Sequence, residues 1–133
     1  MAGIVPDEGE VLIANLVFKG GDVNRGSSLQ LGLIINTSVS ETTTLADIAE
    51  PTGGTYARKT LADASWSVSG GFATYALQTF QPVGTSYAQP VTGYFIATTG
   101  TTPKLLAVEI DANGPYTIDT SSYYDVTPKF PLP

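Results

Sequence analysis

The last third of the chain is a succession of short apolar segments, each of which ends at turn-forming residues. Residues 93–98 read Gly-Tyr-Phe-Ile-Ala-Thr, residues 105–110 read Leu-Leu-Ala-Val-Glu-Ile, and residues 122–130 read Ser-Tyr-Tyr-Asp-Val-Thr-Pro-Lys-Phe. These β-branched, aromatic and aliphatic runs are about five to nine residues long, which is typical of short β-strands. The prolines that follow position 127 restrict any later pairing to the edge of a sheet. The pattern predicts an all-β domain.

The pair Gly70-Gly71 predicts a two-residue hairpin turn, because glycine accepts a positive φ without steric cost. This turn gathers apolar side chains on one face of the hairpin, and a shift of register by one residue would destroy that sorting. The predicted pairs on the apolar face are Val68 with Ala73, Trp66 with Tyr75 and Ala64 with Leu77, and those on the other face are Ser65 with Ala76, Ser67 with Thr74 and Ser69 with Phe72.

Residues 6–18 are predicted to form a short N-terminal helix, with its body at about 7–18. Pro6 suits the start of a helix, and the acids that follow it would face the positive end of the helix dipole. Lys19 with Gly20-Gly21 provides a stop. Apolar residues nearly encircle the helix, so we expect the rest of the protein to cover it well, and a strand over 11–18 is the alternative.

The remaining signals complete the predicted architecture. Residues 29–33 alternate between leucine and other residues, as a half-buried strand does. Residues 36–54 read as a long exposed loop with at most one helical turn at 45–49, and loops of this length are often functional or ordered by a partner. Short strands are expected at 116–119 and 122–127. We therefore expect one domain over 1–133, a mainly antiparallel β-sandwich of jelly-roll-like type with one short N-terminal helix.

Composition excludes several classes of partner. Only 14% of the residues are charged, well below the roughly 25% that is usual, so the surface is largely neutral. The net charge is −6 and the basic residues are scattered, which argues against nucleic-acid binding. The first residues lack the basic region of a signal peptide, and no apolar run approaches the roughly 20 residues of a membrane span. We expect synthesis and folding in a cytoplasm, without membrane association.

The residues available for chemistry predict a protein without catalytic activity. Histidine and cysteine are both missing, which excludes Ser-His and Cys-His nucleophiles and imidazole or thiolate metal ligands. Glu109 with Asp111 or Asp119 is the obvious carboxylate pair, but these acids lie at a strand end and in turn-like sequence. Residues 111–114 resemble only the start of a calcium loop and are interpreted as a turn. We expect no catalytic residue, cofactor or metal site.

The order of the segments resembles a family of small virion proteins encoded by tailed bacteriophages. That family opens with a Val-Pro … Gly-Glu … Leu-Leu segment, continues through a Gly-Tyr-Ala motif and a Trp strand, and ends in a Gly-Tyr … Leu-Leu-x-x-Glu … Gly-Pro-x-x-Ile … Val-Thr-Pro tail. Here Thr55 separates Gly54 from Tyr56, and Ala107-Val108 stands where the family often has Trp-Ala. The matching residues are Val5-Pro6, Gly9-Glu10, Leu12, Gly54, Tyr56-Ala57, Trp66, Gly93-Tyr94, Leu105-Leu106, Glu109, Gly114-Pro115, Ile118 and Val126-Thr127-Pro128.

The resemblance implies a structural protein of the virion, most simply a head decoration or cement protein on the outside of the capsid shell. Its partner would be the major capsid protein, and self-association is expected. The alternatives are a tail, neck or baseplate protein and a carbohydrate-binding β-sandwich on a fibre.

For contact residues we consider the two chain ends, segments 1–5 and 130–133, as binding arms, of which the second is stiffened by its prolines. The alternative is that both ends fold back on their own domain. The expected interface residues are Ile4, Val5, Phe130 and Leu132 in these segments, together with Tyr123 on the last predicted strand.

Overall fold

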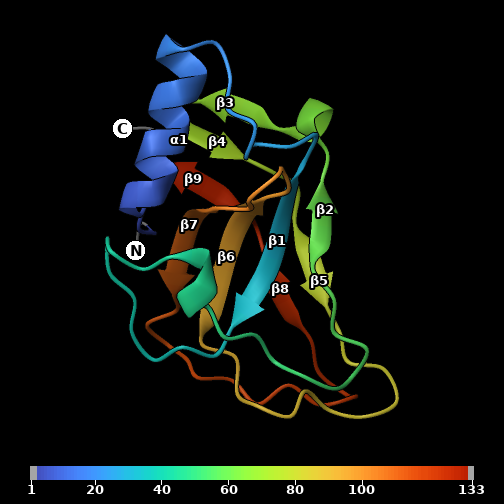
Figure 1. Ribbon diagram of the computed structural model, residues 1–133. Helices are drawn as coiled ribbons and strands as arrows, with labels where there is room; N and C mark the ends of the chain where they lie inside the picture. Colours follow the sequence, from blue (N-terminus) through green and yellow to red (C-terminus); the bar gives the residue numbers. More distant parts are fainter. Residues whose placement is uncertain (1–2, 132–133) are drawn as a thin grey trace.

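The computed structural model describes residues 3–131, which form one α-helix and short strands in three antiparallel sheets (Figure 1). The prediction of a mostly β, antiparallel chain with one short helix is confirmed. Within these residues, no helix combines the length and the apolarity that a membrane crossing requires. The elements are α1 (Asp7–Phe18), β1 (Leu29–Ile34), η1 (Leu45–Asp47), β2 (Lys59–Leu61), η2 (Asp63–Ser65), β3 (Ser67–Ser69), β4 (Phe72–Thr74), β5 (Gln78–Phe80), β6 (Gly93–Thr98), β7 (Leu105–Ile110), β8 (Tyr124–Val126) and β9 (Lys129–Pro131), of which η1 and η2 are single 3-10 turns.

The largest sheet has the strand order β2-β1-β6-β7 and is buried on both faces. In the central ladder Leu31 lies opposite Ile96, and alternation along each strand sends neighbouring side chains to opposite faces. One face shares its core with the two smaller sheets, β3-β4-β9 and β5-β8, while the N-terminal segment and the loop after β1 cover the other. The first core includes Leu31, Leu33, Ile96, Phe80, Val126 and Phe130, and the second includes Ile34, Phe95 and Val108 with Ile4, Val39 and Leu45 packed against them.

Helix α1 occupies the position that the sequence predicts, so the alternative strand over 11–18 does not form. It begins after Pro6 and ends where Gly20 takes a positive φ of 76°. The helix packs against β7, and Gly9 permits this close approach because a Cβ there would lie 2.8 Å from the carbonyl oxygen of Leu106. The outward side of α1 stays bare, contrary to the expectation of a well-covered helix: Val11, Val17 and Phe18 are exposed.

The β3–β4 hairpin has the predicted register, with Ser67 opposite Thr74, Val68 opposite Ala73 and Ser69 opposite Phe72. Gly70 and Gly71 form the turn with φ values of 59° and 80°. The ladder ends at Ser67–Thr74, so the predicted pairs Trp66–Tyr75, Ser65–Ala76 and Ala64–Leu77 lie outside it. Ala64 instead lies in the turn η2, because Ser65 donates its backbone N–H to the carbonyl of Ala62. Leu77 is exposed, so the apolar face of the hairpin is shorter than predicted.

One further segment differs from expectation. Residues 116–119 form no strand and contribute only an isolated bridge between Val91 and Tyr116. The loop after β1 contains the short turn η1 near its predicted place, and the chain itself orders this loop. Asn36 donates its side-chain amide to the carbonyl of Asp47 and accepts the N–H of Ala49.

Candidate functional site

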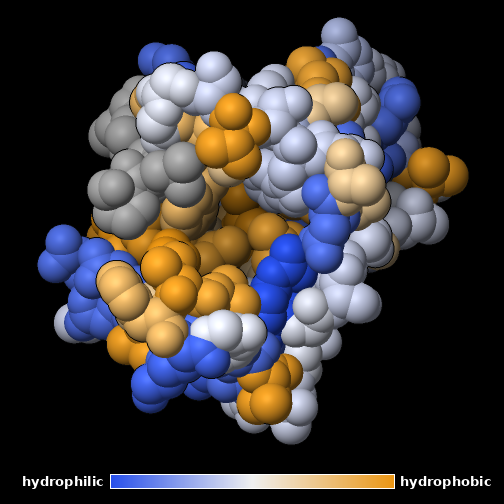
Figure 2. All heavy atoms as spheres, turned by 90° about the horizontal axis from the view of Figure 1, so that it is seen from above, coloured by the Kyte–Doolittle hydropathy of each residue, from blue (hydrophilic) through white to orange (hydrophobic). Residues whose placement is uncertain are grey.

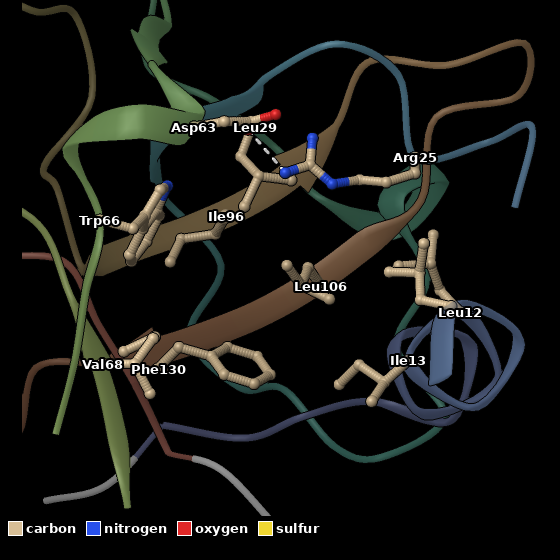
Figure 3. A pocket seen from close by; sticks show the side chains of 12 residues that line it. Leu12, Ile13, Arg25, Leu29, Asp63, Trp66, Val68, Ile96, Leu106 and Phe130 are labelled. Atoms are coloured by element: carbon tan, nitrogen blue, oxygen red, sulfur yellow. Dashed lines mark hydrogen bonds and ion pairs between the residues drawn. The ribbon is translucent and has the colours of Figure 1, made fainter. Parts of the chain in front are cut away.

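A groove opens between α1 and the β3-β4-β9 sheet, at the end of the molecule where α1 stops (Figure 2). It encloses about 430 Å³ and its lining is almost wholly apolar. Figure 3 shows side chains from both walls pointing toward one shared space. The helix supplies Leu12, Ile13 and Leu16, the strands of the main sheet supply Leu29, Ile96 and Leu106, the opposite wall is formed by Trp66, Val68, Ala73 and Phe130, and Arg25 with Asp63 stands at the rim.

The floor of the groove is the protein core itself. Leu12, Ile96 and Leu106 are buried side chains of the first core cluster. Helical spacing brings Leu12 and Leu16 onto the same side of α1, since residues four positions apart lie one above the other. The groove therefore arises because α1 and the hairpin stand apart above a continuous apolar floor.

An ion pair closes one side of the rim. Arg25 Nη2 lies 2.6 Å from Asp63 Oδ1, which joins the connection after α1 to the turn η2. Both side chains are partly solvated, and exposed pairs contribute about 0–1 kcal/mol. The pair therefore orients the two segments more than it stabilises them.

Trp66 forms part of the wall and carries an unsatisfied donor. Its ring meets Tyr75 edge-on with ring centroids 5.3 Å apart. The indole N–H is buried and has no hydrogen-bond partner among the described residues. A buried polar group left in this state costs about 1–3 kcal/mol, so the wall is held by ring packing rather than by polar contacts.

Apolar side chains are also exposed around this end of the molecule. Phe18 is 85% exposed and Val68 is 69% exposed, and both belong to the elements that flank the groove. Where such side chains form one contiguous patch, they mark an interaction site in a soluble protein. The exposed large apolar side chains at and after the end of α1, and on β3, are Leu16, Val17, Phe18, Val23 and Val68.

Comparison with known proteins found no relative of this chain. No family model matches it, and no curated protein or solved structure is significantly similar to it. The function therefore has to be inferred from the residues and their arrangement.

A second, smaller cavity of about 240 Å³ brings together two of the carboxylates that the sequence singled out. Tyr94 donates its hydroxyl to Glu109 at 3.1 Å, and Tyr116 and Tyr124 donate to Asp111 at 3.1 and 3.4 Å. Burial, and then the neighbouring carboxylates, raise the pKa of Tyr94 and Tyr124 well above its ordinary value. Each carboxylate is thus held by tyrosine hydroxyls that stay protonated.

The turn interpretation of these acids fits their other contacts. Asp111 accepts the backbone N–H of Asn113 at 2.9 Å, and Asp119 accepts that of Ser121 at 2.8 Å. Asp119 does not line the cavity with the other two acids. Among residues 3–131, no group of three or more potential ligands is placed to hold a metal ion.

The structure describes four of the five expected interface residues. Ile4 bridges Val108 through backbone hydrogen bonds of 2.8 and 3.0 Å, and Val5 is partly buried against the first core. Phe130 is 6% exposed and lies on β9. It is therefore folded back on its own domain, which was the alternative to a binding arm. Tyr123 is exposed. Leu132 lies outside the described residues.

The groove residues Leu16 and Val68 are absent from the sequence-based candidates. The available signal was the ring of apolar residues around α1, which a small domain cannot cover on every side. The sequence does not indicate that the uncovered side adjoins a cavity, because that depends on where the hairpin packs.

Proposed function

We propose that this chain is a structural protein of a tailed-phage virion, of the head decoration or cement type, which acts through protein–protein contacts. The observation that carries the proposal is the open apolar end formed by the groove and the exposed side chains around it. An isolated chain gains by covering such a surface, since burial of apolar area contributes about 25 cal/mol per Å².

The phage assignment rests on the sequence resemblance described above. Cement proteins stabilise a shell by burying surface across the junctions between its subunits, so interface area is their mechanism. The place of this chain would be the capsid exterior, with the major capsid protein as its partner. The low content of charged residues, 14%, favours such a role because few charges have to be desolvated at a contact.

The finer architecture belongs to the same proposal. We infer that the main sheet and the two smaller sheets form the two layers of a jelly-roll-like β-sandwich. The core that Leu31 shares with Phe80 and Phe130 supports this arrangement, since these residues come from the three different sheets.

Co-sedimentation with empty capsid shells that lack the protein tests the function. We expect saturable binding at hundreds of copies per shell and an increase in the temperature at which the shell opens. Binding at about a dozen copies would favour the neck or tail alternative. No binding to any virion assembly would contradict the proposal.

The second cavity supports one alternative, a carbohydrate-binding domain on a fibre. It combines the aromatic rings of Tyr94 and Tyr124 with the carboxylates of Glu109 and Asp111, which is the mixture of apolar faces and polar groups that ligand sites use. Glycan-array binding that Tyr124→Ala abolishes in a folded protein would favour this alternative over the cement function.

A further inference from the structure

We propose that a second copy of this chain covers the groove, so that two protomers pair through the ends at which their α1 helices stop. This inference rests on the proposed structural role and names the partner at the apolar end. A two-fold axis would relate the two protomers, so that the same patch of each copy contacts its counterpart on the other.

Self-complementarity is the first argument for a second copy. One end of the molecule presents a cavity of about 430 Å³ (Figure 2). Phe18 is exposed at the last position of α1, the helix that forms one wall of this cavity. Phe18 does not line the groove of its own chain, and it is the most exposed of the large apolar side chains that the structure describes. A two-fold axis at this end therefore brings the exposed Phe18 ring of each copy toward the other copy's groove, which residues 3–131 leave open.

Charge is the second argument, because part of the rim of the groove is electrically balanced. The whole chain has a net charge of −6, so most ways of bringing two copies together oppose like charges. Segments 15–30 and 62–75, which form part of the rim, carry two basic and two acidic residues. These residues are Lys19, Arg25, Asp22 and Asp63.

The net charge of the chain therefore lies outside these two segments. Pairing through them opposes fewer like charges than pairing through other faces of the protein would.

The available area is the third argument. From their exposed fractions, Leu16, Val17, Phe18, Val23 and Val68 present on the order of 500 Å² of surface in each protomer. A standard interface buries about 800 Å² on each partner. Two such ends together bury on the order of 1,000 Å², which is the lower limit for a specific interface.

Sedimentation equilibrium on the purified full chain tests the proposal. We expect a dimer at about 10 μM, and we expect Phe18→Lys and Val68→Lys each to raise the dissociation constant by at least about tenfold. Lysine is tolerated at the end of a helix and on an edge strand, so both variants should fold, which circular dichroism checks.

The matched control is Val83→Lys, which makes the same change at a side chain that is 64% exposed and lies in a loop outside segments 15–30 and 62–75. It should leave the dissociation constant unchanged. All three variants lower the net negative charge of the chain equally, so a general change in repulsion between protomers cannot account for a difference among them.

Several outcomes would overturn the inference. A wild-type chain that is monomeric at about 100 μM, a trimer, or a dimer that Phe18→Lys and Val68→Lys leave intact each contradicts it. A monomer that binds the apolar dye anilinonaphthalene sulfonate, and loses this binding in Val68→Lys, would show that the groove receives a small ligand instead.

The shell-binding experiment separates this inference from the proposed function. A wild-type monomer that coats shells would overturn the dimer and leave the function standing. A dimer that fails to bind shells would overturn the function and leave the dimer.

Discussion

The carboxylate of Glu8 accepts the backbone N–H of Leu105 at 2.6 Å, across 97 positions of the chain. The same oxygen accepts the N–H of Leu45 at 3.0 Å, and Lys104 Nζ lies 3.8 Å from the second carboxylate oxygen. One side chain in the first turn of α1 thus ties the helix to the start of β7 and to the long loop. The tie also fixes the helix that forms one wall of the groove.

Replacing Glu8 by alanine should lower the free energy of unfolding by about 2–3 kcal/mol, because two backbone donors lose a charged acceptor. Denaturant titration measures the loss. The control is Glu10→Ala on the same helix, since Glu10 is exposed and makes no hydrogen bond or ion pair with another described side chain. The control should cost less than about 0.5 kcal/mol. Equal losses would assign the effect to the helix dipole instead.

Replacing Trp66 by alanine should cost about 3 kcal/mol, because it removes the ring that packs on Tyr75 and leaves a cavity in the groove wall. Trp66→Phe should cost less than half as much, since it keeps an aromatic ring and removes the unpaired buried donor. Guanidinium titration compares the two variants. If phenylalanine is as costly as alanine, the indole N–H has an acceptor in solution.

A methyl group at Gly93 should disrupt the contact between β6 and β7. The added Cβ would collide with the backbone carbonyl of Glu109, and a strand backbone cannot move aside as a flexible side chain does. We expect Gly93→Ala to lower the free energy of unfolding by about 3 kcal/mol. Gly21→Ala is the matched control, because nothing lies within 4 Å of its added Cβ. Thermal melts of both variants should separate clearly.

The protein should unfold in alkali as its tyrosines ionise. Burial raises the pKa of Tyr56, Tyr94 and Tyr124, so their protonated forms are favoured in the folded state. Below pH 10, near the ordinary tyrosine pKa, this contribution to stability is fully present. Above pH 10 the unfolded chain releases phenolic protons that the folded chain retains, so stability falls as the pH rises toward the folded pKa values.

Absorbance at 295 nm measures tyrosine ionisation, and circular dichroism measures folding in the same titration. We expect the part of the absorbance change that the buried tyrosines contribute to coincide with the loss of the circular dichroism signal above pH 10. Ionisation of the buried tyrosines with an intact circular dichroism spectrum would contradict this expectation.

The elements that the sequence predicts well are those that local chemistry determines. The register around Gly70-Gly71 follows from a glycine turn with apolar and polar residues on alternate sides, and α1 follows from Pro6, a run of acids and a glycine stop. Each of these depends on residues within about ten positions of one another, where turn geometry and helix capping decide the local conformation.

The elements that the sequence misses depend on contacts between distant residues. Strand β9 contains Pro131 and reads as a terminal arm, yet it pairs with β4 on one side only, which is the arrangement that proline permits. Val68 is predicted on the apolar face of the hairpin, and this face borders a groove because η2 ends the hairpin early and α1 stands apart from it. No local pattern reports the width of that gap.

The order of strands in the main sheet has a consequence for the synthesis of the protein. Strand β1 pairs with β2 and β6, and Leu31 finds its partner Ile96 only after about 65 further residues have been made. At roughly 5–20 residues per second the growing chain carries this central strand without its partner for several seconds. Until β6 is made, β1 has β2 on one side only, and the open edge of an apolar strand is a template for aggregation. The interval between the two strands is therefore the stage of production at which a nascent chain most needs chaperone protection.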